Sequence, residues 1–287
     1  MKTPKESPKI SKTAKNAKTP KPRKHATQKF ETETATVPEK KWYKNILSAL
    51  GFNFFVAAMF FVSAFISTFA ASIILGSERT VYLAGNSPLF SAIYSVIIFG
   101  LTLAFVIYLP RKTLNIKTTL KEIGLIGLPT WTDILLAPVG YIVANILAVI
   151  LVNVASGFMN FDVNQTQEGI QDISSLRTQL DYVLTFLTLV VLAPIVEEVL
   201  FRGYLYSKTR RYLGMVASSL IVSAVFGALH GQWNVGIVVF AMSVVCCFIR
   251  EKITGTIWAS VLTHMLRNGL AFYILYVNPS LLSSIGE

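Results

Sequence analysis

Two adjacent glutamates, Glu197 and Glu198, lie at the end of an almost wholly apolar run that begins at Tyr182 and reads YVLTFLTLVVLAPIV. Such a run predicts a membrane helix, and a charged side chain at the centre of a bilayer costs roughly 2.5–3.5 kcal/mol on insertion scales. Two of the three histidines, His230 and His264, also fall within apolar runs. Ionisable side chains inside a membrane usually face the interior of a bundle or a wet cavity. These four residues are therefore candidates for one functional site.

The residues next to these groups are spaced for contacts along helices. Glu198 and Arg202 are four residues apart with the acid first, which favours an ion pair on one helix face. Glu197 points about 100° away from Glu198 around the same helix, so its carboxylate is freer to face a water molecule. The same spacing of four places Phe226 and His230 on one face of another helix.

His264 and Asn268 also share a helix face, and the Asn268 amide could hydrogen-bond an oxyanion. A turn is predicted at Gly214, and a rise of about 1.5 Å per residue puts Glu197 and His230 at one depth, roughly 25 Å from that turn. His264 lies roughly 17 Å from the next turn by the same rise. Straight helices therefore leave His264 several ångströms out of register with the other two groups.

A carboxylate and an imidazole that share a water molecule form a general-base pair. A second histidine with an asparagine could stabilise the oxyanion of a tetrahedral intermediate. Together these groups are sufficient for peptide hydrolysis without a covalent intermediate. Each feature also has a purely structural interpretation, since the Glu198–Arg202 pair could serve stability alone and a single histidine on an apolar face is often a core residue.

The same side chains could instead hold a metal ion. Two histidines and a carboxylate with one open position form a known catalytic zinc set, here Glu197, His230 and His264. The HExxH spacing that preforms a zinc-binding helix face is absent. No cofactor is therefore favoured, although zinc stays open. The chain has no evident Ser-His-Asp set, P-loop or GxGxxG motif, and nothing in it indicates nucleic-acid binding.

The composition predicts a membrane protein. Of the 287 residues, 53% are hydrophobic and 14% are charged, which is too apolar for a soluble domain. The apolar runs that are long enough to span a bilayer lie at 47–75, 88–109, 134–156, 182–201, 213–232, 234–250 and 256–277. We expect an all-α polytopic membrane bundle of about seven, or six to eight, transmembrane helices. Cys246 and Cys247 are interpreted as packing residues, because neighbours in sequence rarely form a good disulfide.

Four segments are predicted along the chain. Residues 1–42 are a lysine-rich stretch without apolar periodicity and are expected to be a disordered cytoplasmic tail. Residues 43–179 hold the N-terminal transmembrane helices and a cytoplasmic interfacial linker at 110–133, in which a short helix is expected to end near Pro129. Residues 180–277 form the predicted catalytic core, and residues 278–287 form a C-terminal tail.

The distribution of charge predicts the orientation. Residues 1–44 hold 13 of the 26 Lys and Arg but only four of the 15 acids, so this segment carries +9 of the net +11. Farther along, basic loops alternate with mixed or acidic ones. The positive-inside rule then places the N-terminus in the cytosol and the C-terminus outside. The basic tail could also touch anionic lipid headgroups.

Three short motifs occur in order, each on an apolar run: EEVLFR from Glu197, FGALH from Phe226 and HMLRN from His264. They fit the patterns EExxxR, FxxxH and HxxxN, and together they resemble the CPBP family (CAAX protease and bacteriocin-processing, also called abortive-infection), which includes the type II CAAX prenyl endopeptidases. The resemblance covers about residues 180–275. It implies an intramembrane endopeptidase in which Glu197 and His230 would activate the water.

The resemblance also implies that Glu198 with Arg202 would support the site and that His264 with Asn268 would form the oxyanion pocket. Members of the family are described both as metalloproteases and as metal-independent glutamate proteases, and the sequence does not decide between them. The implied partners are peptide or protein substrates within the membrane, prenylated or bacteriocin-like, and the membrane lipids.

We expect an integral protein of a bacterial plasma membrane. The first alternative is a non-catalytic bacteriocin-immunity or scaffold protein, although the retention of every motif residue argues against it. The second alternative is a proton-coupled transporter that uses Glu197 and His230 as a relay. Transporters often show repeated halves, and no internal repeat is evident in this sequence.

Overall fold

The computed structural model describes residues 42–163, 165, 167 and 173–281. These residues form helices and connecting turns, with no strand among them. The predicted all-α architecture of a polytopic membrane bundle is therefore confirmed. The basic tail predicted at 1–42 lies almost entirely outside the described residues, as does the chain beyond residue 281.

The first half of the described chain forms helices whose starts are encoded locally. α3 begins with Ser87 as its N-cap and Pro88 in its first turn, and α4 begins with a capping box between Thr130 and Asp133. The four helices of this half are α1 (Trp42–Leu75), α2 (Ser77–Asn86), α3 (Pro88–Thr113) and α4 (Trp131–Ser156). α2 was not predicted, because its ten residues are too polar to register as an apolar run.

A single long helical stretch follows, from Gln179 to Arg210, and begins at a capping box between Thr178 and Asp181. Two π-helical turns interrupt it. Its successive parts are α5 (Gln179–Phe186), the π turn Leu187–Leu192, α6 (Ala193–Glu198), the π turn Val199–Leu205 and α7 (Tyr206–Arg210).

The remaining helices are shorter, and two of them also end in π turns. They are α8 (Met215–Ala228), α9 (Trp233–Ile249) with the π turn Arg250–Thr254, and α10 (Trp258–Phe272) with the π turn Tyr273–Val277. Each of the seven predicted apolar runs therefore folds into a helix. Within the described residues, five helical stretches are long and apolar enough to cross a membrane: Tyr43–Leu75, Pro88–Thr113, Trp131–Ser156, Gln179–Arg210 and Trp233–Thr254.

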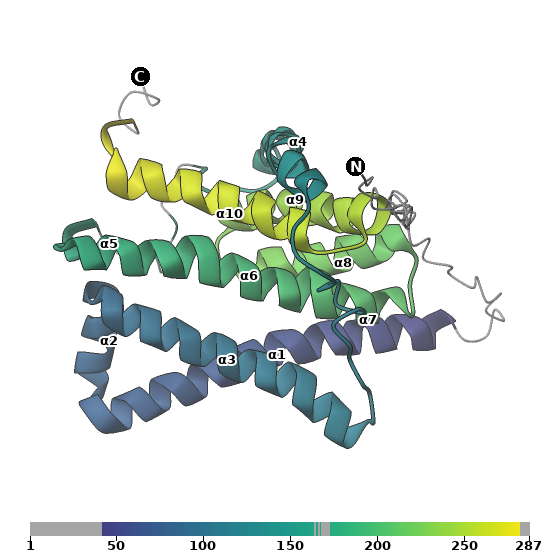
Figure 1. Cartoon of the computed structure of the whole chain (residues 1–287), viewed down its shortest axis with the longest axis horizontal. Helices are drawn as coiled ribbons and strands as arrows, with labels where there is room; N and C mark the ends of the chain where they lie inside the picture. Colours follow the sequence, from purple (N-terminus) through teal and green to yellow (C-terminus); the bar gives the residue numbers. More distant parts are fainter. Residues whose placement is uncertain (1–41, 164, 166, 168–172, 282–287) are drawn as a thin grey trace, which may run out of the picture.

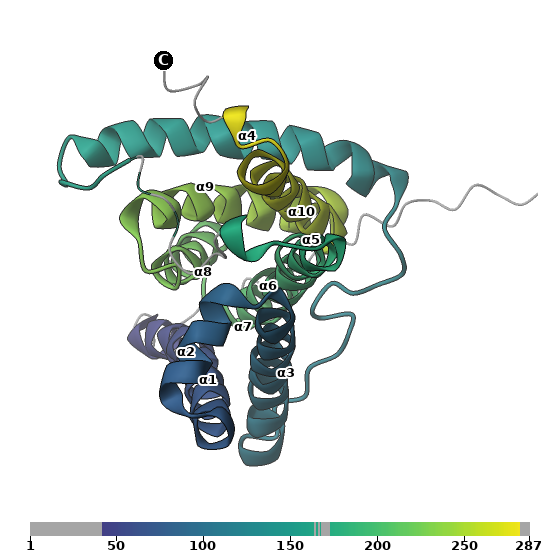
Figure 2. The same ribbon diagram turned by 90° about the vertical axis from the view of Figure 1, so that its left-hand side faces the viewer.

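The helices are arranged around the stretch formed by α5, α6 and α7. α1 and α3 cross each other on one side of it, and α8, α9 and α10 lie on the other side (Figure 1). α4 packs against α9 and α10. It is seen nearly end-on in Figure 1 and along its length in Figure 2, so it runs across α5–α7 and covers the face of the bundle formed by α9 and α10.

The linker between α3 and α4 is not helical, so the interfacial helix predicted there is wrong. Residues 114–130 form turns and irregular backbone, in which Gly124 and Gly127 have φ values of 77° and 69°. Backbone in this left-handed region interrupts a right-handed helix. The Gly124 carbonyl accepts a hydrogen bond of 3.2 Å from the Ile257 N–H, so the linker is tied to the turn before α10.

Candidate active site

Glu198 is fully buried and has two basic partners. Its Oε1 lies 3.0 Å from Arg202 Nη1 and 3.0 Å from His264 Nδ1. The predicted ion pair between Glu198 and Arg202 is therefore confirmed. A buried carboxylate is unfavourable unless it is paired. These two contacts compensate the Glu198 carboxylate for the solvent that does not reach it.

Phe226 connects Arg202 with both histidines. The Arg202 guanidinium lies over the Phe226 ring, 4.3 Å from its centroid, where a cation–π interaction is favourable. The rings of His230 and His264 meet Phe226 edge to face, with centroids at 5.0 Å and 6.0 Å. One buried aromatic ring thus sets the position of both imidazoles.

His264 lies between the two glutamates. An ionised carboxylate only accepts hydrogen bonds, so Nδ1–H of His264 donates to Glu198 Oε1 at 3.0 Å. The opposite nitrogen, Nε2, lies 3.8 Å from Glu197 Oε2. The side chain of Glu197 is 22% exposed, whereas that of Glu198 is 0% exposed. Of the two carboxylates, only that of Glu197 can therefore meet a water molecule directly.

His230 follows the end of α8 and is fixed by its own helix. A backbone carbonyl can only accept, so Nδ1–H of His230 donates to the Phe226 carbonyl at 2.8 Å. In the neutral ring, Nε2 then carries a lone pair that can take a proton. No hydrogen bond or ion pair joins His230 to Glu197 in the described part of the chain.

Asn268 is held by a backbone carbonyl that the long helix leaves free. At the first π turn, the Ala193 N–H donates to Thr188 O, one residue earlier than in an α-helix. Pro194, the next residue, has no N–H to offer. The Leu189 carbonyl therefore lacks a helical donor, and Asn268 Nδ2 donates to it at 2.9 Å.

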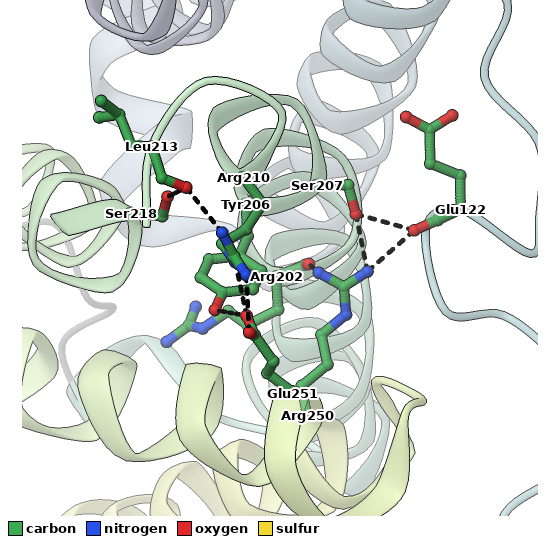
Figure 3. A network of polar contacts seen from close by, with 9 residues as sticks. All are labelled: Glu122, Arg202, Tyr206, Ser207, Arg210, Leu213, Ser218, Arg250 and Glu251. Atoms are coloured by element: carbon green, nitrogen blue, oxygen red, sulfur yellow. Dashed lines mark hydrogen bonds and ion pairs between the residues drawn. The ribbon is translucent and has the colours of Figure 1, made fainter. Parts of the chain in front are cut away.

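A second displaced carbonyl lies on the other side of the glutamates. At the π turn Val199–Leu205, the Tyr206 N–H donates to Phe201 O. Arg250 Nη1 donates to the carbonyl of Arg202 instead (Figure 3). The segment that carries Glu197 and Glu198 is thus held at both ends by hydrogen bonds from side chains of other helices. Pro194, Leu189 and Arg250 were not predicted to belong to the site, and only the proline in an apolar run could have signalled this.

Arg250 also ties the linker to the long helix. Its Nη2 donates to the Glu122 carbonyl at 2.9 Å and to Ser207 Oγ at 2.7 Å (Figure 3). The Glu122 carboxylate pairs with Lys208 at 2.8 Å and with Arg211 at 2.6 Å. These contacts hold the linker against the C-terminal end of the long helix.

A neighbouring group of polar side chains joins α7 to the start of the π turn that follows α9. Glu251 pairs with Arg210 at 2.8 Å and also accepts a hydrogen bond from the Tyr206 hydroxyl (Figure 3). Arg210 Nη1 in turn donates to the Leu213 carbonyl at 2.6 Å, which holds the turn before α8. The end of the long helix is therefore tied both to α9 and to the start of α8.

An apolar cavity of about 600 Å³ lies between α4, α8 and α9. Side chains of α4, α8 and α9 line it together with Gly231 and Gln232, the two residues that follow His230. Gly227 and Gly236 bring α8 and α9 together here, since a Cβ on either glycine would lie within 2.9 Å of the other's carbonyl oxygen. The cavity is therefore a place for an apolar group close to the chain that carries His230, although the imidazole itself is not part of its lining.

The three residues that could have held zinc do not form a metal site as they stand. Among the residues that the structure describes, no three His, Cys, Asp or Glu side chains converge closely enough to share one metal ion. His264 Nδ1 is engaged with Glu198, and its Nε2 is 3.8 Å from Glu197. The arrangement of Glu197, His230 and His264 does not fit a preformed zinc centre.

Comparison with known proteins identifies this part of the chain. Residues 179–270 match the family model described as type II CAAX prenyl endopeptidase Rce1-like. The match begins at the first residue of α5 and ends within α10, so it contains every residue predicted for the site. No curated protein and no solved structure matches the chain.

Proposed function

Because the chain belongs, over residues 179–270, to the Rce1-like family of type II CAAX prenyl endopeptidases, we propose that it cleaves peptide bonds within the membrane with a water molecule activated by Glu197. The family supports an intramembrane CAAX protease in general, and the helices are those of an integral membrane protein. The observation that carries the specific proposal is the position of His264, which links the partly exposed Glu197 to the buried Glu198–Arg202 pair.

Glu197 and His230 are proposed to act together as the general base. The Glu197 carboxylate is the one that solvent reaches, and His230 Nε2 can take a proton because Nδ1–H is bound to a carbonyl. A water molecule between them would lose its proton as it attacks the scissile carbonyl carbon. The same proton would then pass to the leaving amine. Groups positioned in this way typically contribute about 10²–10⁴-fold to a rate.

His264 and Asn268 are proposed to stabilise the tetrahedral oxyanion. Asn268 Nδ2 has two N–H groups, and only one is needed for the bond to Leu189 O. The second is available to an oxyanion, as is His264 Nε2 when that nitrogen carries a proton. The Glu198 carboxylate accepts from Nδ1–H and so holds the ring with Nε2 on the opposite side. Loss of one oxyanion donor typically costs about 10²–10³-fold in rate.

The apolar cavity between α4, α8 and α9 suits a substrate with a large apolar group. Its volume of about 600 Å³ is within the range of small-molecule sites. A prenyl chain or an aliphatic stretch of a bacteriocin-like peptide would fill such a space. The proposed substrates are therefore membrane-associated peptides of this kind, cut by an enzyme of a bacterial plasma membrane.

The proposal is tested with purified protein in detergent. Wild type, Glu197→Gln and the control Glu78→Gln, an exposed acid of α2, are given a fluorogenic farnesylated peptide and a library of membrane peptides. We expect cleavage by wild type and Glu78→Gln and at least about a hundredfold loss in Glu197→Gln.

Repeating the assay with a chelator separates two chemistries. Activity that survives the chelator would support the glutamate mechanism, whereas loss with chelator and recovery with zinc would contradict it and favour a metalloprotease. No cleavage by any of the three proteins, with every substrate offered, would favour the non-catalytic immunity or scaffold protein.

A further inference from the structure

The buried pair of Glu198 and Arg202 leaves several of its own polar atoms without a partner. The pair is formed through one carboxylate oxygen, Oε1, and one guanidinium nitrogen, Nη1. Glu198 Oε2 and Arg202 Nε and Nη2 are also buried, and they have no hydrogen-bond partner among the described residues. Buried donors and acceptors of native proteins are nearly always bonded to protein groups or to ordered water. These atoms therefore need a partner that the surrounding side chains do not supply.

Two buried serines add further groups of this kind. Ser223 of α8 and Ser243 of α9 are fully buried, and neither hydroxyl is bonded to a described residue. Buried hydroxyls in the first half of the chain behave differently. Ser67 and Thr102 each donate at 2.8 Å to the carbonyl four residues earlier in their own helix. The hydroxyls of Ser223 and Ser243 make no such bond, so they can bind a group outside their helices.

Ser223 lies on the side of α8 that meets Arg202. It is three residues before Phe226 and so shares the same helix face. The Arg202 guanidinium lies over the Phe226 ring, 4.3 Å from its centroid. Side chains of a helix lean toward its N-terminus, so the Phe226 ring leans toward Ser223. The Ser223 hydroxyl is therefore placed beside the guanidinium.

Ser243 approaches the same place from α9. It lies seven residues before Arg250, which is two helical turns or roughly 10 Å along the same face. Arg250 donates to the carbonyl of Arg202, so this face of α9 is turned toward the long helix. α9 and the long helix both end beside the linker and therefore run in the same direction. Ser243 is thus on the side of Arg202 where Glu198 lies.

We propose that ordered water molecules are held in the interior between the long helix, α8 and α9, bound by Arg202, Ser223, Ser243 and Glu198 Oε2. A buried water needs about two to four polar partners, and this group offers N–H donors, hydroxyls and a carboxylate oxygen. Water also suits the charge of the site, because the Glu198 carboxylate already balances Arg202 and leaves no net charge to attract an ion. The inference does not depend on the proposed hydrolysis.

These waters would have a structural consequence for the site. They would give the guanidinium the hydrogen bonds that Glu198 does not give it, and so fix the orientation of the pair. Since Glu198 Oε1 also accepts from His264 Nδ1–H, the position of that imidazole would depend on the same waters.

The test measures the contact between water and individual arginines in a lipid bilayer. Protein with isotope-labelled arginine is studied by water-edited solid-state NMR, in which magnetisation passes from water to nearby N–H groups. Arg250 is the matched control, because it is also buried but its guanidinium donates to protein oxygens. The signals are assigned by their loss in Arg202→Lys and Arg250→Lys. The Arg202 signal should build up severalfold faster than the Arg250 signal, and equal or slower build-up would overturn the proposal.

Serine variants test which groups hold the water. In the double variant Ser223→Ala with Ser243→Ala, the Arg202 signal should lose most of its lead over the Arg250 signal. Ser67→Ala removes a hydroxyl that is bonded within its own helix, so it should leave that lead unchanged. A double variant that matches wild type would overturn the proposal. If the double variant does not fold, the comparison of the two arginines in wild type still decides.

An experimental structure at a resolution that shows water gives an independent answer. Density is expected within hydrogen-bond distance of Arg202 Nη2 and of the hydroxyl of Ser223 or Ser243. Direct bonds between the guanidinium and these hydroxyls, with no water between them, would overturn the proposal. An anomalous signal at this place after bromide replaces chloride would also overturn it, because the site would then hold an anion.

Discussion

Glu197 and Glu198 are neighbours in the sequence, yet the helix gives them different surroundings. Glu198 is enclosed between Arg202 and His264, whereas Glu197 is the more exposed carboxylate and has only the longer contact to His264. One carboxylate is thus part of the packed interior and the other is available to a reactant. The two should respond differently to the same substitution.

We expect Glu198→Gln to unfold at a clearly lower temperature than wild type. Removing one partner of a buried ion pair leaves the other charge unpaired and typically costs about 3–5 kcal/mol. Glu197→Gln should unfold near the wild-type temperature, because its carboxylate is in no such pair. Thermal unfolding of both variants in the same detergent measures this. Equal destabilisation of the two would contradict the division between them.

At the scale of elements, the two π turns explain why the site residues are held where they are. Each turn displaces one carbonyl from the helical ladder, and a side chain from another helix takes it: Asn268 at Leu189 and Arg250 at Arg202. π turns are often found at functional sites. Here they leave backbone carbonyls of the long helix free to accept hydrogen bonds from side chains of neighbouring helices.

Replacing Pro194 by alanine should weaken this device. The new N–H could bond to Leu189 O and compete with Asn268 for this carbonyl. If half or more of the stabilisation of the oxyanion depends on the orientation of Asn268, kcat should fall by about tenfold. Stability should rise, since a helix-interior proline costs about 3 kcal/mol. Activity and thermal unfolding are measured on the same preparations.

Pro138→Ala is the matched control, because Pro138 lies inside α4 and outside the site. It should also raise stability but leave kcat unchanged. If Pro194→Ala is as active as Pro138→Ala, the free carbonyl of Leu189 has no part in positioning Asn268.

The sequence predicted the elements well where hydrophobicity alone decides them. Each long apolar run became a helix, and the spacing of four between Glu198 and Arg202 gave the correct ion pair. The π turns could not be predicted, because they depend on tertiary partners such as Arg250. The short helix predicted in the linker did not form, because the backbone of Gly124 and Gly127 is left-handed and interrupts a right-handed helix.

The position of His264 shows where straight-helix geometry failed. Counting residues from successive turns assumed that all turns lie at one depth in the membrane. On that assumption, His264 lay several ångströms away from the depth of the glutamates. Arg250 bonds to the carbonyl of Arg202, so the turn between α9 and α10 lies well inside the end of the long helix at Arg210. His264 therefore reaches the depth of Glu198, where its Nδ1 lies 3.0 Å from Oε1.

At the scale of the whole molecule, the basic side chains of the linker, the end of α7 and the π turn after α9 gather at one end. The linker, the end of α7 and the π turn after α9 meet there through Glu122, Arg250 and Glu251 (Figure 3). α2 lies at the opposite end of α1 and α3 (Figure 1). We propose that the basic end, and with it the N-terminus, faces the cytosol.

Cysteine labelling in intact cells tests this orientation. The two native cysteines, Cys246 and Cys247, are free and buried, so they should contribute little background. A membrane-impermeant maleimide should label Glu78→Cys in α2 from outside, but Lys117→Cys in the linker only after lysis. The reverse pattern would place the N-terminus outside.

The linker also divides the chain into two parts that are held together by more than the covalent bond. Its exposed start lies before Glu122 and Gly124, whose contacts stay with the C-terminal part. α1 and α3 in turn pack against α5, α6, α7 and α8. Two polypeptides, separated between Lys117 and Thr118 and produced in the same cell, should therefore assemble by complementation and co-purify through a tag on either one. The two parts of the single chain would then resemble the two subunits of a heterodimer, which associate through their packed surfaces without a covalent link.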